Sequence, residues 1–90
     1  MVPSLQFSVP ADPRYRVLGP EVAAKYAALA GCSALDVQGV LAEVDQAAAD
    51  VAVDGEDIQM LLGVAADGLL ISMTCGGKRA EVRRALPAGE

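Results

Sequence analysis

The sequence predicts an α+β fold, a two-layer sandwich in which two helices cover one face of a small, mainly antiparallel sheet. Two observations support this prediction. Apolar residues alternate with polar ones at the start of the chain and again in its second half, and two central segments repeat apolar residues with helical spacing. The length of 90 residues allows one domain with one modest core. We therefore expect a single domain, residues 1–90, with the element order β-α-α-β-β.

The first expected element is a strand in "LQFSV", residues 5–9, where every second residue is apolar. A helix should follow over residues 14–30 and end at Gly31. Pro20 lies inside this range, so the helix must either kink there or delay its regular start to Pro20. The apolar residues that keep one helical phase are Tyr15, Leu18, Val22, Tyr26 and Leu29.

The second helix should open at Ser33, because Ser33 followed by Asp36 resembles a capping box, and should run to about Ala52. Asp54 and Gly55 then end it. Its apolar stripe consists of Val37, Val40, Leu41, Val44, Ala48 and Val51, and the polar residues Asp36, Glu43, Gln46 and Asp50 lie opposite. Asp45 belongs to neither set, and we expect it at the boundary between this helix and the sheet.

A hairpin is expected in the remainder, with strands over residues 58–64 and 69–75 joined by the turn "AADG", residues 65–68. One face carries Ile58, Met60, Leu62, Val64, Leu69, Ile71, Met73 and Cys75 and should face the core. The other face is mostly polar but includes Leu61 and Leu70, a small apolar spot that a partner could cover. The alternative is that these two leucines are isolated surface residues, which monomers also carry.

The chain has no histidine. This absence excludes Cys-His and Ser-His-Asp catalysis and histidine phosphotransfer, and it removes a common ligand of transition metals. The two cysteines, Cys32 and Cys75, lack the spacing of a zinc site or a disulfide scaffold. We therefore expect no metal, no cofactor and no catalytic residue.

The net charge is −5, and residues 21–67 are almost purely acidic, whereas Lys78, Arg79, Arg83 and Arg84 crowd the C-terminal segment, residues 78–90. Nucleic acid is not an expected partner of such a chain. The basic segment is either a solvated tail or a means of self-association or of docking an acidic partner. No membrane-spanning run and no signal peptide is evident, so we expect a cytoplasmic protein that does not bind membranes.

Residues 7–52, "FSVPADPRYRVLGPEVAAKYAALAGCSALDVQGVLAEVDQAAADVA", resemble the opening of the anti-sigma-factor serine kinases, a branch of the histidine-kinase-like ATPase (Bergerat-fold) family. The similar features are a strand followed by "PADPRY", a long helix ended by "AGCS", and a second helix. In that family the second helix carries a catalytic or water-positioning Glu and, four residues later, an Asn that holds the magnesium of ATP. The resemblance places Asp45 at the Glu position and Ala49 at the Asn position.

Alanine cannot coordinate magnesium, and the family's adenine-binding DxGxG motif has no good counterpart, since "MTCGGKR" keeps only Gly76 and Gly77. The resemblance therefore implies a shortened, degenerate relative in which Asp45, Ala49, Gly76 and Gly77 are vestigial. The plain alternatives are a surface acid at Asp45 and a strand-ending turn at Gly76 and Gly77, which lack the spacing of a P-loop.

Two functions remain open. The favoured one is a non-catalytic regulatory interaction module resembling an anti-sigma factor, which binds a protein partner, such as a sigma factor or an anti-anti-sigma-like regulator, or a second copy in a homodimer. The alternative is a weak ATP-binding protein or serine kinase of the anti-sigma-factor type. The expected interaction residues are Leu61, Leu70, Lys78, Arg79, Arg83 and Arg84.

Overall fold

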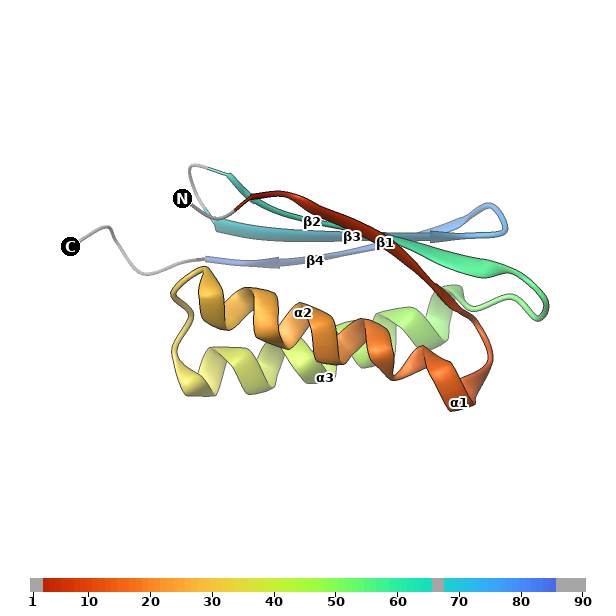
Figure 1. The fold of residues 1–90 in the computed structure, drawn as a ribbon, viewed down its shortest axis with the longest axis horizontal. Coiled ribbons are helices and arrows are strands. Elements are labelled where there is room, and N and C mark those ends of the chain that lie inside the picture. The colour runs from red at the N-terminus through yellow and green to blue at the C-terminus, as the bar shows by residue number, and fades with distance from the viewer. Residues whose placement is uncertain (1–2, 66–67, 86–90) are drawn as a thin grey trace.

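The fold is a two-layer α+β sandwich, as the sequence predicts (Figure 1). The computed structural model describes residues 3–65 and 68–85. In chain order the elements are β1 (Leu5–Pro10), α1 (Pro13–Arg16), α2 (Leu18–Leu29), α3 (Ala34–Val51), β2 (Asp57–Ala65), β3 (Gly68–Cys75) and β4 (Lys78–Arg84). All neighbouring strands are antiparallel, in the order β1-β2-β3-β4. Helices α2 and α3 lie side by side on one face of this sheet (Figure 1).

A fourth strand corrects the expectation of a basic tail at residues 78–90. Lys78–Arg84 forms β4 and pairs with β3, and residues 86–90 lie outside the described part of the chain. The connection is a two-residue loop, Gly76 and Gly77, with positive φ angles of 52° and 88°. Positive φ at both loop positions is the pattern of the type I′ turn that joins antiparallel strands. The predicted turn at residues 65–68 includes residues 66 and 67, which are also outside the described residues, although Ala65 does pair with Gly68.

The first helical segment is divided in two by a break at Val17. Pro20 has no N–H to donate to the carbonyl of Arg16, so a continuous helix would lose that bond, whereas Pro20 fits within the first turn of α2. The regular helix therefore restarts at Leu18, two residues before the expected Pro20.

The predicted apolar stripe of this segment is confirmed at Tyr26, which is buried, but is wrong at Tyr15, Leu18 and Leu29, which are 49%, 47% and 76% exposed. The buried face consists instead of Gly19, Pro20, Ala23, Tyr26 and Ala27. Three of these residues, Gly19, Ala23 and Ala27, are small, which lets α2 approach the sheet closely. A Cβ atom at Gly19 would lie only 2.7 Å from the Sδ atom of Met60 on β2. Close packing on these small residues leaves Leu18 and Leu29 on the outside of α2.

The orientation of α3 matches the prediction. The side chains of Val40, Val44, Ala48 and Val51 are buried, whereas Glu43 and Asp50 are exposed. Ser33 caps the helix, because its Oγ accepts a hydrogen bond of 3.1 Å from the Asp36 N–H. The buried helix faces meet a continuous apolar layer on the sheet, formed by Val9, Ile58, Met60, Leu62, Leu69, Ile71, Met73, Cys75 and Val82.

Candidate functional site

Asp45 lines a groove between α2 and α3. The groove has a volume of about 370 Å³, and its lining consists of Val17, Pro20, Glu21, Gln38, Leu41, Ala42 and Asp45. No strand contributes to this lining, so Asp45 does not lie at the boundary between helix and sheet, as the sequence had led us to expect. Ala49, one turn later on α3, is exposed. The position that the resemblance assigns to a catalytic acid is therefore an exposed position of the helical layer.

Gly76 and Gly77 line a different hollow, of about 410 Å³, beside the β3–β4 turn. Its lining residues are Gly55, Glu56, Asp57, Gln59, Thr74, Cys75, Gly76 and Gly77. This set shares no residue with the groove at Asp45. Glu56 and Asp57 bring two carboxylates to the hollow, and like charge disfavours a bound phosphate there. The structure thus does not bring Asp45 together with Gly76 and Gly77, which the resemblance marks as vestigial.

The four predicted basic residues of the C-terminal segment lie on β4 but fall into separate groups. Arg79 and Arg83 flank Glu81, with nitrogen-to-oxygen distances of 2.5 and 3.3 Å. The hydrogen bond from Arg79 and then the nearby arginine charges hold the pKa of the Glu81 carboxyl below its usual value. Lys78 is exposed at the start of the strand. Arg84 belongs to the helix-facing side of β4.

Arg84 forms ion pairs with two acids of α3, at 2.5 Å from Glu43 and 3.6 Å from Asp36. Between these acids on the same helical face lies Gly39, where a Cβ atom would be only 2.5 Å from Nη2 of Arg84. The glycine therefore leaves the space that the guanidinium occupies. The charges of the acidic body and the basic segment meet here within one chain, so Arg84 is not free to dock a partner in this arrangement.

Leu61 and Leu70 lie where the sequence predicts, on the sheet face that the helices do not cover. Leu61 is 47% exposed and Leu70 is half-buried. Leu61 pairs with Ser72, and Leu70 precedes Ser72 by two residues, so the two leucines are diagonal neighbours on adjacent strands. A shallow hollow of about 260 Å³ next to Leu61 is lined by Gln6, Gln59, Met60, Leu61, Ser72, Thr74 and Arg79. We call this side of the sheet, which carries Leu61, Leu70 and the polar residues around them, the outer sheet face.

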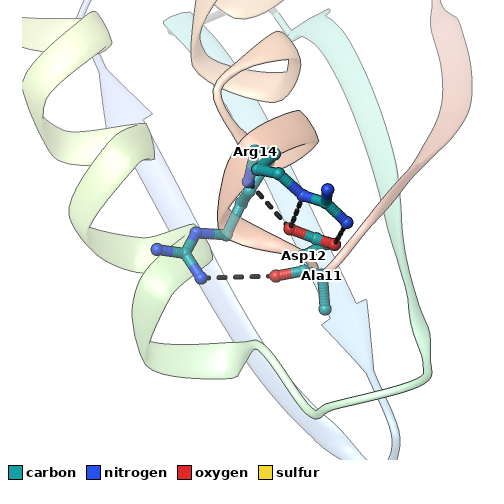
Figure 2. A network of polar contacts seen from close by, with 4 residues as sticks. Ala11, Asp12 and Arg14 are labelled. Atoms are coloured by element: carbon teal, nitrogen blue, oxygen red, sulfur yellow. Dashed lines mark hydrogen bonds and ion pairs between the residues drawn. The ribbon is translucent and has the colours of Figure 1, made fainter.

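Sequence reasoning missed a polar network at the entry to the helical layer (Figure 2). The carboxylate of Asp12 accepts hydrogen bonds from the Arg14 backbone N–H at 2.9 Å and from Arg14 Nη2 at 2.8 Å. These bonds lower the pKa of the Asp12 carboxyl. Arg16 reaches back to the Ala11 carbonyl at 3.3 Å. The signal was present in the sequence, since an Asp directly before a Pro is a typical helix start, and the network serves to cap α1.

The cysteines have no visible chemical role. Cys75 is buried in the core and Cys32 is half-buried, and both are free thiols. Burial, with a further contribution from the Asp36 carboxylate, raises the pKa of the Cys32 thiol and so disfavours the reactive thiolate. Within residues 3–65 and 68–85, no cluster of three acidic or cysteine side chains is placed to hold a metal ion. Nor is any helix in this part of the chain long and apolar enough to cross a membrane.

Comparison of the chain with protein-family models, with curated proteins and with solved structures finds no match.

Proposed function

We propose that this chain is a non-catalytic, regulatory protein-interaction module that binds a protein partner or a second copy of itself. The observation that carries the proposal is the one-sided packing of the fold. Both long helices cover the same face of the sheet (Figure 1), and on the outer sheet face Leu61 is left exposed and Leu70 half-buried. Covering these leucines would remove apolar area from water, which favours association.

The surroundings of the two leucines fit a protein-binding surface. Arg83 pairs with Leu70 across β3 and β4, and Glu81 pairs with Ser72, so charged residues border the apolar spot on one side. Gln59 and Thr74 border it on another side and are exposed. An apolar centre within a polar rim is the usual anatomy of a protein–protein interface. The partner surface should therefore present apolar side chains to Leu61 and Leu70 and polar groups to their surroundings.

The placement of the nucleotide candidates supports a role without catalysis. An ATP triphosphate is held through a metal ion, and Ala49 offers no ligand for one. Asp45 and the Gly76–Gly77 turn line separate hollows, and the hollow at the turn contains Glu56 and Asp57. The sequence resemblance to anti-sigma factors favours a regulator among the possible partners. We place the protein in the cytoplasm as part of this proposal, since its two free thiols fit a reducing compartment.

The experiment compares the wild type with Leu61→Lys/Leu70→Lys in affinity purification from the source cells, with quantitative mass spectrometry. A matched control, Leu29→Lys/Leu35→Lys, places two lysines on the helical layer, at leucines that are 76% and 83% exposed. A partner that is lost with the leucine variant and kept with the control supports the proposal. Equal recovery of every bound protein by all three chains would show that the outer sheet face does not bind a partner. Saturable binding of Mg-ATP would instead favour the nucleotide-binding alternative.

A further inference from the structure

The two edges of the sheet differ in charge. On β4, five of seven residues are charged, namely Lys78, Arg79, Glu81, Arg83 and Arg84. Charged edge strands resist pairing with other strands, because their side chains lose hydration when a neighbour approaches. The opposite edge, β1, has the sequence LQFSVP and no charged residue. The sheet is therefore protected at β4 and unprotected at β1.

Hydrogen bonding shows which backbone groups β1 offers at its edge. The Ala11 N–H donates to the Glu56 carbonyl at 3.1 Å, in line with the register of β1 and β2. Hydrogen-bonded pairs alternate along an antiparallel ladder, so the odd-numbered residues of β1 bond to β2. Gln6 and Ser8 consequently direct their N–H and C=O groups away from β2. Pro10 has the same orientation and lacks an N–H, which an edge strand tolerates.

The side chains along this edge also favour a neighbour. Leu5 is 38% exposed and Phe7 is half-buried, although both lie on the helix-facing side of the sheet. They are incompletely covered because β1 is the last strand. Gln6 and Ser8, on the other side, are exposed and uncharged. A further strand beside β1 would cover Leu5 and Phe7 without burying any charge of β1.

We propose that β1 is a homodimer interface, at which the β1 strands of two copies pair antiparallel about a two-fold axis and extend the sheet across both chains. Antiparallel pairing of a strand with its own copy is self-complementary, as a two-fold interface requires. In the register that centres on Phe7, Gln6 exchanges hydrogen bonds with Ser8 of the second copy. The two Phe7 side chains then lie opposite each other on the helix-facing side. The inference rests on the part of the proposed function in which the chain binds itself.

The test compares Gln6→Lys/Ser8→Lys with a control of equal charge change, Gln38→Lys/Gln46→Lys. Gln38 and Gln46 are exposed residues of α3, so the control places two lysines on the helical layer and none on the sheet. Sedimentation should give the wild type and the control a mass of two 9.2 kDa chains. The edge variant should sediment as one chain or raise the dimer dissociation constant at least about tenfold.

Amide hydrogen exchange gives a second reading that needs no variant. In the wild type the Gln6 and Ser8 amides should become protected as the concentration rises, because the second copy bonds to them. A wild type that remains a single chain at about 100 μM would overturn the inference. A dimer with unprotected Gln6 and Ser8 amides would overturn it too, as would equal masses for the edge variant and the control. After any of these results, the proposed function would still stand if the Leu61→Lys/Leu70→Lys variant failed to bind a protein partner other than a second copy of the chain.

Discussion

Arg84, at the end of β4, pairs with Glu43 in the middle of α3, with 2.5 Å between Nη2 and Oε2. The contact joins the last strand to the helical layer across 41 residues of sequence. The Arg84 side chain is 25% exposed, and its Nε atom has no hydrogen-bond partner among the described residues. Desolvation of that N–H offsets part of the attraction, so the pair should stabilise the fold only modestly.

Arg84→Ala should lower the free energy of unfolding by about 1 kcal/mol, because a half-exposed ion pair and some packing are lost. Glu43→Ala should cost about 0.5 kcal/mol, and the double variant should cost less than the sum. Urea denaturation of the four proteins measures the coupling. Since salt screens the exposed part of the pair, the coupling should shrink in about 1 M sodium chloride. Strictly additive losses would show that the pair does not contribute.

The Gly39→Ala substitution tests whether position 39 must be glycine in order to leave space for the Arg84 guanidinium. In an Arg84→Ala background, this change should stabilise the fold by about 1 kcal/mol, because Ala favours a helix interior over Gly. In the wild type the new Cβ would lie 2.5 Å from Arg84 Nη2 and would displace it, so the gain should be smaller. Thermal and urea unfolding of both pairs give the comparison. The same gain in stability in both backgrounds would show that Arg84 does not require a glycine at position 39.

Val44→Ala should destabilise the fold by about 1 to 3 kcal/mol, through lost apolar burial and the cavity left behind. Val44 is fully buried on α3. The matched control is Asp50→Ala, on the exposed side of the same helix, which should change stability by less than about 0.5 kcal/mol. Equal shifts of the denaturation midpoint would contradict the orientation of α3.

Ionisation of the Tyr26 phenol should lower the stability of the fold at alkaline pH. Its hydroxyl donates to the Pro3 carbonyl at 2.8 Å, and burial raises its pKa above the ordinary value. The unfolded phenol ionises near pH 10, so this contribution is complete below about pH 10 and is lost as the pH rises through the folded-state pKa. Tyr26→Phe should unfold more easily by about 1 kcal/mol at neutral pH but lose less stability above about pH 10. Tyr15→Phe, at a half-exposed tyrosine, is the control, and parallel pH curves for Tyr26→Phe and the wild type would refute this role.

Periodicity was sufficient to predict the elements that bury large apolar residues on one face. It identified α3 and the strands β1, β2 and β3, whose alternation is strong. It failed for β4, because only Ala80 and Val82 mark the core side of a strand that is otherwise charged. The neighbouring Gly76 and Gly77 were the signal that would have revealed a hairpin.

The remaining errors concern contacts that sequence spacing does not specify. Only Tyr26 of the predicted α2 stripe is buried, because Ala23 and Ala27 pack closer to the sheet than leucines can, and a count of large apolar residues favours a different side of the helix. The position of Asp45 on its helix was correct, but helical phase alone does not say whether a flank meets the sheet or α2. The contact between Arg84 and Gly39 joins distant parts of the sequence and needed the fold.

The central claim, that this chain does not act through a bound nucleotide, is tested most directly by titrating Mg-ATP into the labelled protein while its amide NMR spectrum is recorded. The account predicts no saturable change at Asp45, Ala49, Gly76 or Gly77 up to millimolar nucleotide. Saturable shifts at both Asp45 and the glycine turn, with a dissociation constant below about 100 μM, or roughly 5.5 kcal/mol of binding, would contradict it.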